Sequence, residues 1–167
     1  MTAQSKRVAL CGLLLALMLV LGYVESLLPA VSGVPGIKLG LSNGVLIFAV
    51  YMLNVPTAFV LMGLKVALSG LLFGGVSAMI YAAAGGVLSL TVMCLLSRVR
   101  GLHPVVVSMA GGVFHNVGQL GMAMLILQTP SLAYYLAVLM LSGLATGAVT
   151  GVAASSVMKH VKSIRHT

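Results

Sequence analysis

The sequence predicts an all-α, polytopic integral membrane protein, and three observations support this fold class. Hydrophobic residues make up 60% of the 167 residues and charged residues only 6%, whereas a soluble domain carries about a quarter charged residues. Apolar runs of about 20 residues follow one another, as transmembrane helices do. The alternation of apolar and polar residues that is typical of outer-membrane barrels does not occur. We therefore expect a single transmembrane domain over residues 1–167.

Six membrane spans are expected, over about 8–28, 39–53, 56–73, 76–97, 104–127 and 131–157. The first is followed by the loop sequence "PAVSGVPG", and "NVP" makes a tight turn before the third, with Pro56 at a first helical position. The sequences "FGG", "RVRGLHP" and "QTPS" separate the remaining spans. We expect the N-terminal segment to be retained rather than cleaved as a signal, because its apolar run continues to Leu28.

Positive charges flank the predicted spans instead of forming one patch. The formal net charge is +8. Most basic residues outside the spans gather before the first, between the fourth and fifth, and at the C-terminus: Lys6, Arg7, Arg98, Arg100, Lys159, Lys162 and Arg165. The loops on the other side contain no Lys or Arg, although Lys38 lies at the edge of the first loop. By the positive-inside rule both termini then face the cytoplasm. We expect a multi-pass protein of the bacterial inner (cytoplasmic) membrane whose cations meet anionic lipid, and no binding of nucleic acid.

Small residues recur every four positions on two of the spans. Gly143, Gly147 and Gly151 do so on the sixth, and Ala78, Ala82 and Gly86 on the fourth. Such stripes let helix backbones approach closely in lipid. We interpret them as internal packing faces, with partner docking as the alternative.

The two cysteines, Cys11 and Cys94, both lie inside apolar runs without a CxxC motif. We interpret them as small core residues rather than as a disulfide or a metal pair.

A polar stripe interrupts the fifth span. Ser108, Gly112, His115, Asn116 and Gln119 fall within about a 100° arc of a helix and lie near the middle of the membrane. Polar groups at that depth need partners or a water-filled cavity. We interpret the stripe as the wall of a ligand pocket, with hydrogen bonding between helices as the alternative.

Lys65 is a second polar anomaly, near the middle of the third span, with Ser69 one turn further on the same face. An uncompensated lysine at that depth costs about 2.5–3.5 kcal/mol on insertion scales. Its only possible carboxylate partner in the chain is Glu25, near the outer end of the first span. Lys65 therefore indicates an anionic ligand, unless it is a structural cation bonded to backbone carbonyls.

The stretch "ESLLPAVSGVPGIKLGLSN" (25–43) joins the first two spans on the predicted outer side. Lys38 alone would be an interfacial anchor. Beside Ser42, Asn43 and a loop rich in glycine and proline, it could instead help to close a site over a substrate that enters from outside.

Catalysis by this chain is not expected. The sequence contains no Asp, so the acidic metal-diphosphate motifs of prenyl-chain synthases cannot be present, and no Walker motif, zinc spacing or Ser-His-Asp set occurs. With Glu25 as the one side-chain carboxylate, carboxylate acid–base chemistry and Mg²⁺ binding lack their ligands. We expect no metal site and no cofactor.

Three stretches carry a family likeness: "ESLLP…PGIKLGLSN", "KVALSGLLFGG" and "GGVFHNVGQL". Over about Val8 to Ser156 the chain resembles the Gx transporter family, whose members are often labelled heptaprenyl diphosphate synthase component I. That family is similar to the substrate-binding S components of energy-coupling factor (ECF) vitamin transporters. The resemblance implies six helices and a vitamin-like ligand captured from outside beneath the first loop. It also implies a coupling subunit and two ATPases as partners, which dock on small residues of the first helix. Gly12 and Ala16 stand where that docking motif is expected, although Gly12 replaces the more usual alanine.

The function we expect is that of an S-component-like subunit, which captures a small anionic solute for ATP-driven uptake. Its predicted substrate-binding residues come from four of the six spans and the first loop: Glu25, Lys38, Asn43, Lys65, Ser69, His115, Asn116 and Gln119. One alternative is a non-catalytic membrane subunit of a prenyl diphosphate synthase. The other is a structural scaffold whose polar stripe only holds helices together.

Overall fold

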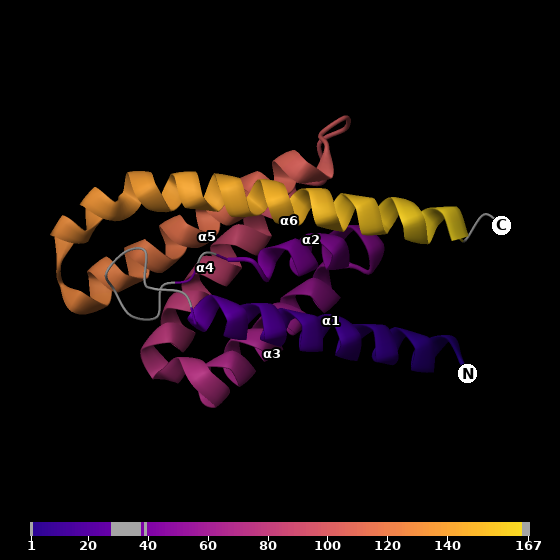
Figure 1. The fold of residues 1–167 in the computed structure, drawn as a ribbon, viewed down its shortest axis with the longest axis horizontal. Coiled ribbons are helices and arrows are strands. Elements are labelled where there is room, and N and C mark those ends of the chain that lie inside the picture. Colours follow the sequence, from indigo (N-terminus) through magenta and orange to yellow (C-terminus); the bar gives the residue numbers. More distant parts are fainter. Residues whose placement is uncertain (1, 28–37, 39, 165–167) are drawn as a thin grey trace.

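The computed structural model describes residues 2–27, 38 and 40–164, in which all regular structure is helical. The helices, shown in Figure 1, are α1 (Ala3–Ser26), α2 (Asn43–Met52), α3 (Val55–Ser69), α4 (Gly75–Leu96), α5 (Pro104–Leu127) and α6 (Leu136–Ile164). A π-helical turn, η1 (Gly70–Gly74), joins α3 to α4, and a 3-10 turn, η2 (Pro130–Tyr135), precedes α6. The chain is therefore all-α, as the sequence predicts.

Local sequence explains where several of these helices begin. Thr2 accepts a hydrogen bond from the Ser5 backbone N–H at the start of α1, and Asn54 caps α3 in the same way through Thr57. At the start of α5, His103 Nδ1 accepts from the Val105 N–H. The turns predicted at "NVP" and before Pro104 are thus confirmed.

Four continuous helical stretches are long and apolar enough to cross a membrane: Gln4–Ser26, Val55–Leu96, Pro104–Leu127 and Pro130–Val161. The second has 42 residues and would be about 63 Å long if straight, twice the hydrocarbon thickness of about 30 Å. It instead turns back at Gly75, where φ is 74°. The ten-residue helix α2 is about 15 Å long and does not reach across a bilayer by itself.

Consecutive helices from α3 onward pack antiparallel. A Cβ placed on Gly86 of α4 would lie 2.9 Å from the Met62 sulfur of α3, and one on Gly70 would lie 2.7 Å from Met79 Cβ. The glycine stripe of α6 contacts α5 in the same manner. A Cβ on Gly143 would lie 2.7 Å from the Gly112 carbonyl oxygen. The interpretation of the small-residue stripe as a packing face is confirmed for α6. In the α4 stripe, Gly86 packs against Met62 of α3.

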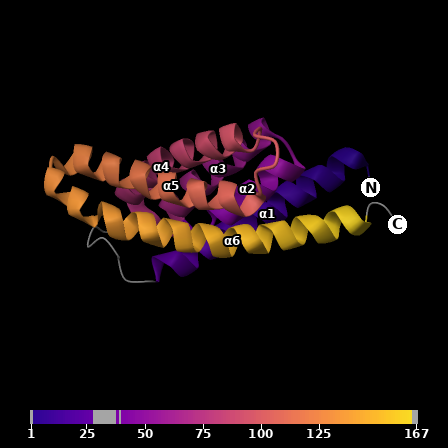
Figure 2. The same ribbon diagram turned by 90° about the horizontal axis from the view of Figure 1, so that it is seen from above.

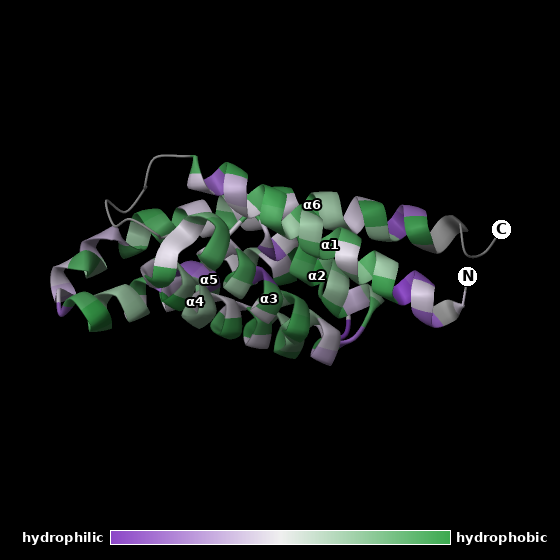
Figure 3. Cartoon of the chain, turned by 90° about the horizontal axis from the view of Figure 1, so that it is seen from below, coloured by the Kyte–Doolittle hydropathy of each residue, from purple (hydrophilic) through white to green (hydrophobic). Residues whose placement is uncertain are grey.

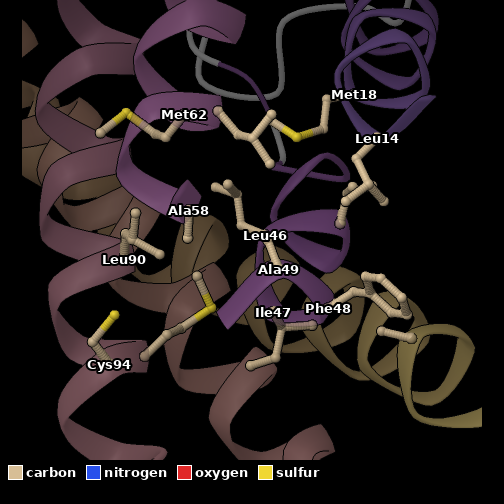
Figure 4. Packing of buried hydrophobic residues seen from close by; sticks show 14 of the residues in the cluster. Leu14, Met18, Leu46, Ile47, Phe48, Ala49, Ala58, Met62, Leu90 and Cys94 are labelled. Carbon is tan, nitrogen blue, oxygen red and sulfur yellow. The ribbon is translucent and has the colours of Figure 1, made fainter. Parts of the chain in front are cut away.

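Short α2 forms the centre of the larger hydrophobic core. Every residue from Asn43 to Ala49 is buried, and Leu46 and Ile47 are surrounded by side chains of α1, α3 and α4 (Figure 4). Cys94 belongs to this core, Cys11 packs at its margin, and both are free thiols. A smaller cluster of Tyr81, Leu120, Ala123 and Leu139 joins α4, α5 and α6.

The start of α1 and the end of α6 lie at the same end of the molecule (Figures 1 and 2). The turn before α3 is at this end too, because Arg7 Nη2 donates to Thr57 Oγ1 over 3.1 Å. Coloured by hydropathy, the helices are mostly hydrophobic along their length, while strongly hydrophilic residues mark the two terminal helical ends (Figure 3). This pattern fits a multi-pass membrane protein with polar residues at the interfaces.

Candidate functional site

Glu25 anchors the chain that enters α2. The residue lies at the end of α1 and is only 5% exposed. Its Oε1 accepts hydrogen bonds from the backbone N–H groups of Gly40 and of Leu41, the latter over 2.9 Å. Gly40 has a φ of 87°, and a Cβ there would lie 2.7 Å from Asn43 Nδ2 and 3.0 Å from His115 Cδ2. Only glycine fits this crossing point, which brings Glu25, Asn43 and His115 together.

A chain of hydrogen bonds continues from Lys38 into α5. The Lys38 backbone N–H donates to Gln119 Oε1 over 2.8 Å, and Gln119 Nε2 lies 2.5 Å from His115 Nε2. Because a backbone N–H can only donate, it fixes Oε1 as the acceptor and turns the amide N–H₂ toward the imidazole. His115 Nε2 must then accept, so the arrangement requires a neutral imidazole that carries its proton on Nδ1.

Two lysine side chains share the single carboxylate of this region. Lys65 is 5% exposed, and its Cε would lie 3.7 Å from a Cβ on Gly22. The ammonium group of Lys38 lies 4.8 Å from the Phe73 ring centroid, a cation–π contact. Both lysines interact electrostatically with Glu25, but neither forms a salt bridge with it within the described residues. With Glu25 ionised, the side chains of Lys38, Lys65 and Glu25 together carry a net positive charge.

Three buried polar atoms here have no hydrogen-bond partner among the described residues: Glu25 Oε2, Ser42 Oγ and Asn43 Nδ2. The Nδ1 side of His115 instead lies against the backbone of Gly85 on α4, with which it interacts. A buried polar group without a partner costs about 1–3 kcal/mol. The unpartnered atoms come from α1 and the start of α2, where the hydrogen-bonded chain and the lysines also meet. We call Glu25, Lys38, Asn43, Lys65, His115 and Gln119 the polar cluster. It combines buried donors and acceptors with an excess of positive charge.

Asn116 and Ser69, the remaining predicted site residues, have hydrogen-bond partners outside the polar cluster. Asn116 Nδ2 donates to the Leu139 carbonyl over 2.6 Å and approaches Ser142 Oγ at 3.3 Å, so it bonds to α6. Ser69 Oγ donates to the Val66 carbonyl of its own helix over 3.2 Å. Ser108 lies against Thr150 of α6, with 3.4 Å between the hydroxyl oxygens. The predicted stripe of span five is therefore two rows, one at the polar cluster and one at α6.

Two features of the polar cluster were not predicted from sequence. The positive φ of Gly40 brings its backbone to the Glu25 carboxylate. In the sequence, only the glycine itself, between Lys38 and "LSN", indicates this conformation. Phe73 contacts Lys38 and also meets Tyr23 edge-on, with 5.6 Å between ring centroids. Aromatic residues near the end of a span are common at membrane interfaces, so their pattern did not single out this pair.

Gly12 and Ala16, the predicted docking residues, are exposed on α1. A Cβ on Gly12 would meet nothing within 4 Å. This face of α1 is not used for packing within the described part of the chain.

Comparison with known proteins gives one result. Residues 14–157 match the family described as heptaprenyl diphosphate synthase component I. Searches of curated proteins and of solved structures each found no match.

Proposed function

Because the chain belongs to the heptaprenyl diphosphate synthase component I family, we propose that it is a non-catalytic membrane subunit of a prenyl diphosphate synthase. The family match over residues 14–157 is the observation that carries this proposal. The chain supplies no Asp and a single Glu, whereas Mg²⁺ at a substrate phosphate is usually held by one or two carboxylates. One oxygen of that Glu25 already accepts two backbone N–H groups. The chemistry would therefore belong to a partner subunit rich in aspartate.

The polar cluster supports ligand binding as part of this role. Its lysines can bind a phosphate or carboxylate by charge-assisted hydrogen bonds, and Asn43, His115 and Gln119 can orient it. The unpartnered Asn43 Nδ2 is a hydrogen-bond donor, which matches an anionic ligand. Asn116 and Ser69 are better explained as structural residues, because each already bonds to a neighbouring backbone carbonyl.

A second candidate function is the S component of an ECF-type uptake system, and the position of the polar cluster favours it. Glu25 is at the end of α1 that is remote from the N-terminus, and with both termini cytoplasmic it would face outward. Six crossings of the bacterial inner membrane would then be required, with the ten-residue α2 as the shortest helix among them. A site in the outer half suits a solute taken from outside, and the unpacked face at Gly12 and Ala16 would suit a coupling subunit.

Affinity purification in a mild detergent tests the two functions against each other. A tagged full-length chain should recover a soluble synthase subunit with Asp-rich motifs, and the complex should make prenyl diphosphate while the chain alone does not. Recovery of a transmembrane coupling subunit with ATPases would contradict the synthase assignment and support uptake. Gly12→Leu is the matched variant for the uptake outcome, since nothing lies within 4 Å of its Cβ position. It should leave folding intact and prevent recovery of the coupling subunit.

A further inference from the structure

An apolar groove lies between α1 and α6, with α2 as its floor. The contacts of α2 with both helices hold them in place, while no Cα atom of α1 lies within 8 Å of one in α6 among the described residues. Figure 1 shows α2 between them. The groove has a volume of about 560 Å³. Its walls are formed by α1 from Leu10 to Leu21 and by α6 from Val149 to Val161. The hydroxyl of Thr150, which also lines it, already donates to the Thr146 carbonyl over 2.8 Å. The groove thus presents hydrocarbon and no polar group in need of a partner.

A basic cavity continues the groove at the end that holds both termini. This cavity, of about 550 Å³, is lined by Lys6, Arg7 and Asn54, and it shares Leu10, Phe48 and Val161 with the groove. Arg7 is held toward α3 by its hydrogen bond to Thr57. The one acidic residue of the chain, Glu25, lies near the far end of α1. Within the part of the chain that the structure describes, the opening therefore carries two cations that no side-chain carboxylate nearby neutralises.

The length of the groove fits one leaflet of a membrane. From Leu10 to Leu21 the α1 axis rises about 16 Å, roughly half of the hydrocarbon core of about 30 Å. An occupant would have an anionic head at the interface and an apolar tail that reaches toward the middle of the bilayer. Phosphate groups suit the head position, because Lys and Arg bind them with charge-assisted hydrogen bonds.

We propose that the cavity and groove bind a prenyl diphosphate, with the diphosphate at Lys6 and Arg7 and the isoprenoid chain between α1 and α6. This inference rests on the proposed synthase function, since a cytoplasmic synthase partner would release such a molecule at the face that holds the termini. The site is separate from the polar cluster, which lies toward the other end of α1. Its role would be to transfer the water-insoluble product from the partner into the inner leaflet.

Equilibrium binding of geranylgeranyl diphosphate to the purified full-length chain, in uncharged detergent and without a partner, tests this site. Binding should saturate. Geranylgeraniol, which lacks the charge, and inorganic diphosphate, which lacks the tail, should each bind at least tenfold more weakly. The Lys6→Gln/Arg7→Gln double variant should lose at least tenfold in affinity, and so should Ala153→Phe, which fills the groove.

Matched controls use the same substitutions outside the site. Arg98→Gln/Arg100→Gln removes two exposed cations between α4 and α5, and Ala137→Phe adds the same ring to an exposed position of α6. Both should bind like the unmodified chain.

Three results would overturn the proposal. The first is unchanged affinity in the double variant. The second is equal competition by phosphatidylglycerol, which would mean a general lipid groove. The third is loss of binding in Lys65→Met alone, which would place the diphosphate in the polar cluster. The binding assay contains no partner, so its result is independent of the affinity purification. A chain that recovers the synthase but does not bind geranylgeranyl diphosphate would overturn the groove proposal alone. A chain that binds geranylgeranyl diphosphate but recovers no synthase would overturn the proposed synthase assembly alone.

Discussion

Glu25 accepts hydrogen bonds from backbone N–H groups and forms no salt bridge with a lysine in the described part of the chain. This arrangement determines the chemistry of the polar cluster. Glu25 Oε1 accepts from Gly40 and Leu41, so part of its charge serves to fix the entry into α2. Lys38 and Lys65 are left with only longer-range attraction to it. Leaving a cation in the interior without a hydrogen-bonded anion is unfavourable for folding. Such a cost is typical of functional sites, where a ligand supplies the missing charge.

Lys65→Met separates a binding role from a structural one. Met keeps the length of the side chain and removes a buried charge that forms no salt bridge, so the variant without ligand should be at least as stable as the parent. The gain should stay below the cost of about 2.5–3.5 kcal/mol on insertion scales, because Lys65 is attracted to Glu25 in the parent. Any rise in melting temperature that inorganic diphosphate or a small carboxylate gives the parent should be lost in the variant. Thermal unfolding in detergent, with and without these anions, measures both effects.

Lys65→Arg is the matched control, because it keeps the charge and should keep most of the anion response. A Lys65→Met variant that unfolds several degrees below the parent would instead assign Lys65 to holding the helices together.

At the scale of elements, sequence patterns located the helices well and their tertiary partners less well. Prolines and caps set the starts of α3 and α5, where Asn54 and His103 bond to the first turn. The reduced length of α2 was harder to predict, because its beginning depends on the Gly40 conformation and on a carboxylate fifteen residues earlier. Local propensity contains no information about such a contact.

The polar stripe of α5 shows the same limit at the candidate site. Its residues share an arc, yet His115 and Gln119 meet the polar cluster while Asn116 bonds to the Leu139 carbonyl. Which row faces a ligand follows from how α4 and α6 pack on either side. The close approach of α5 to both helices at glycines sets that packing.

Gly112→Ala tests this packing. A Cβ on Gly112 would lie 2.2 Å from the Gly143 carbonyl oxygen, a backbone atom that cannot move without shifting α6. We expect a loss of about 1–3 kcal/mol in the free energy of unfolding, as for other overpacked sites. Denaturant titration in mixed micelles measures the loss.

Gly121→Ala on the same helix is the control, since nothing lies within 4 Å of its Cβ position. The higher helix propensity of alanine should make that variant slightly more stable, by up to about 1 kcal/mol. Equal effects of the two substitutions would contradict a close crossing of α5 and α6 at Gly112.

At the scale of the whole molecule, the shared end of the termini and the basic residues near them support a cytoplasmic location for both ends. Because consecutive helices run antiparallel, the connections between them lie alternately at one end of the bundle and at the other. The turn at Asn54 lies with the termini, through the Arg7 contact. The turn at η1, by contrast, lies near the polar cluster, through the contact of Phe73 with Lys38. Six crossings with both ends inside would account for this alternation and for the charge bias together.

Cysteine labelling tests the six-span topology directly. In a chain with Cys11→Ala and Cys94→Ala, a single cysteine replaces Arg100, in the turn between α4 and α5, or Thr129, in the turn before η2. A membrane-impermeant maleimide should label the Thr129→Cys chain in intact cells. The Arg100→Cys chain should react only after the membrane is opened, because its turn would be cytoplasmic. Labelling of both positions in intact cells would mean that α5 does not cross the membrane, and the reverse pattern would place the polar cluster in the cytoplasmic half. An inverted chain would weaken uptake from outside and would put the groove opening, with Lys6 and Arg7, on the side away from any cytoplasmic synthase.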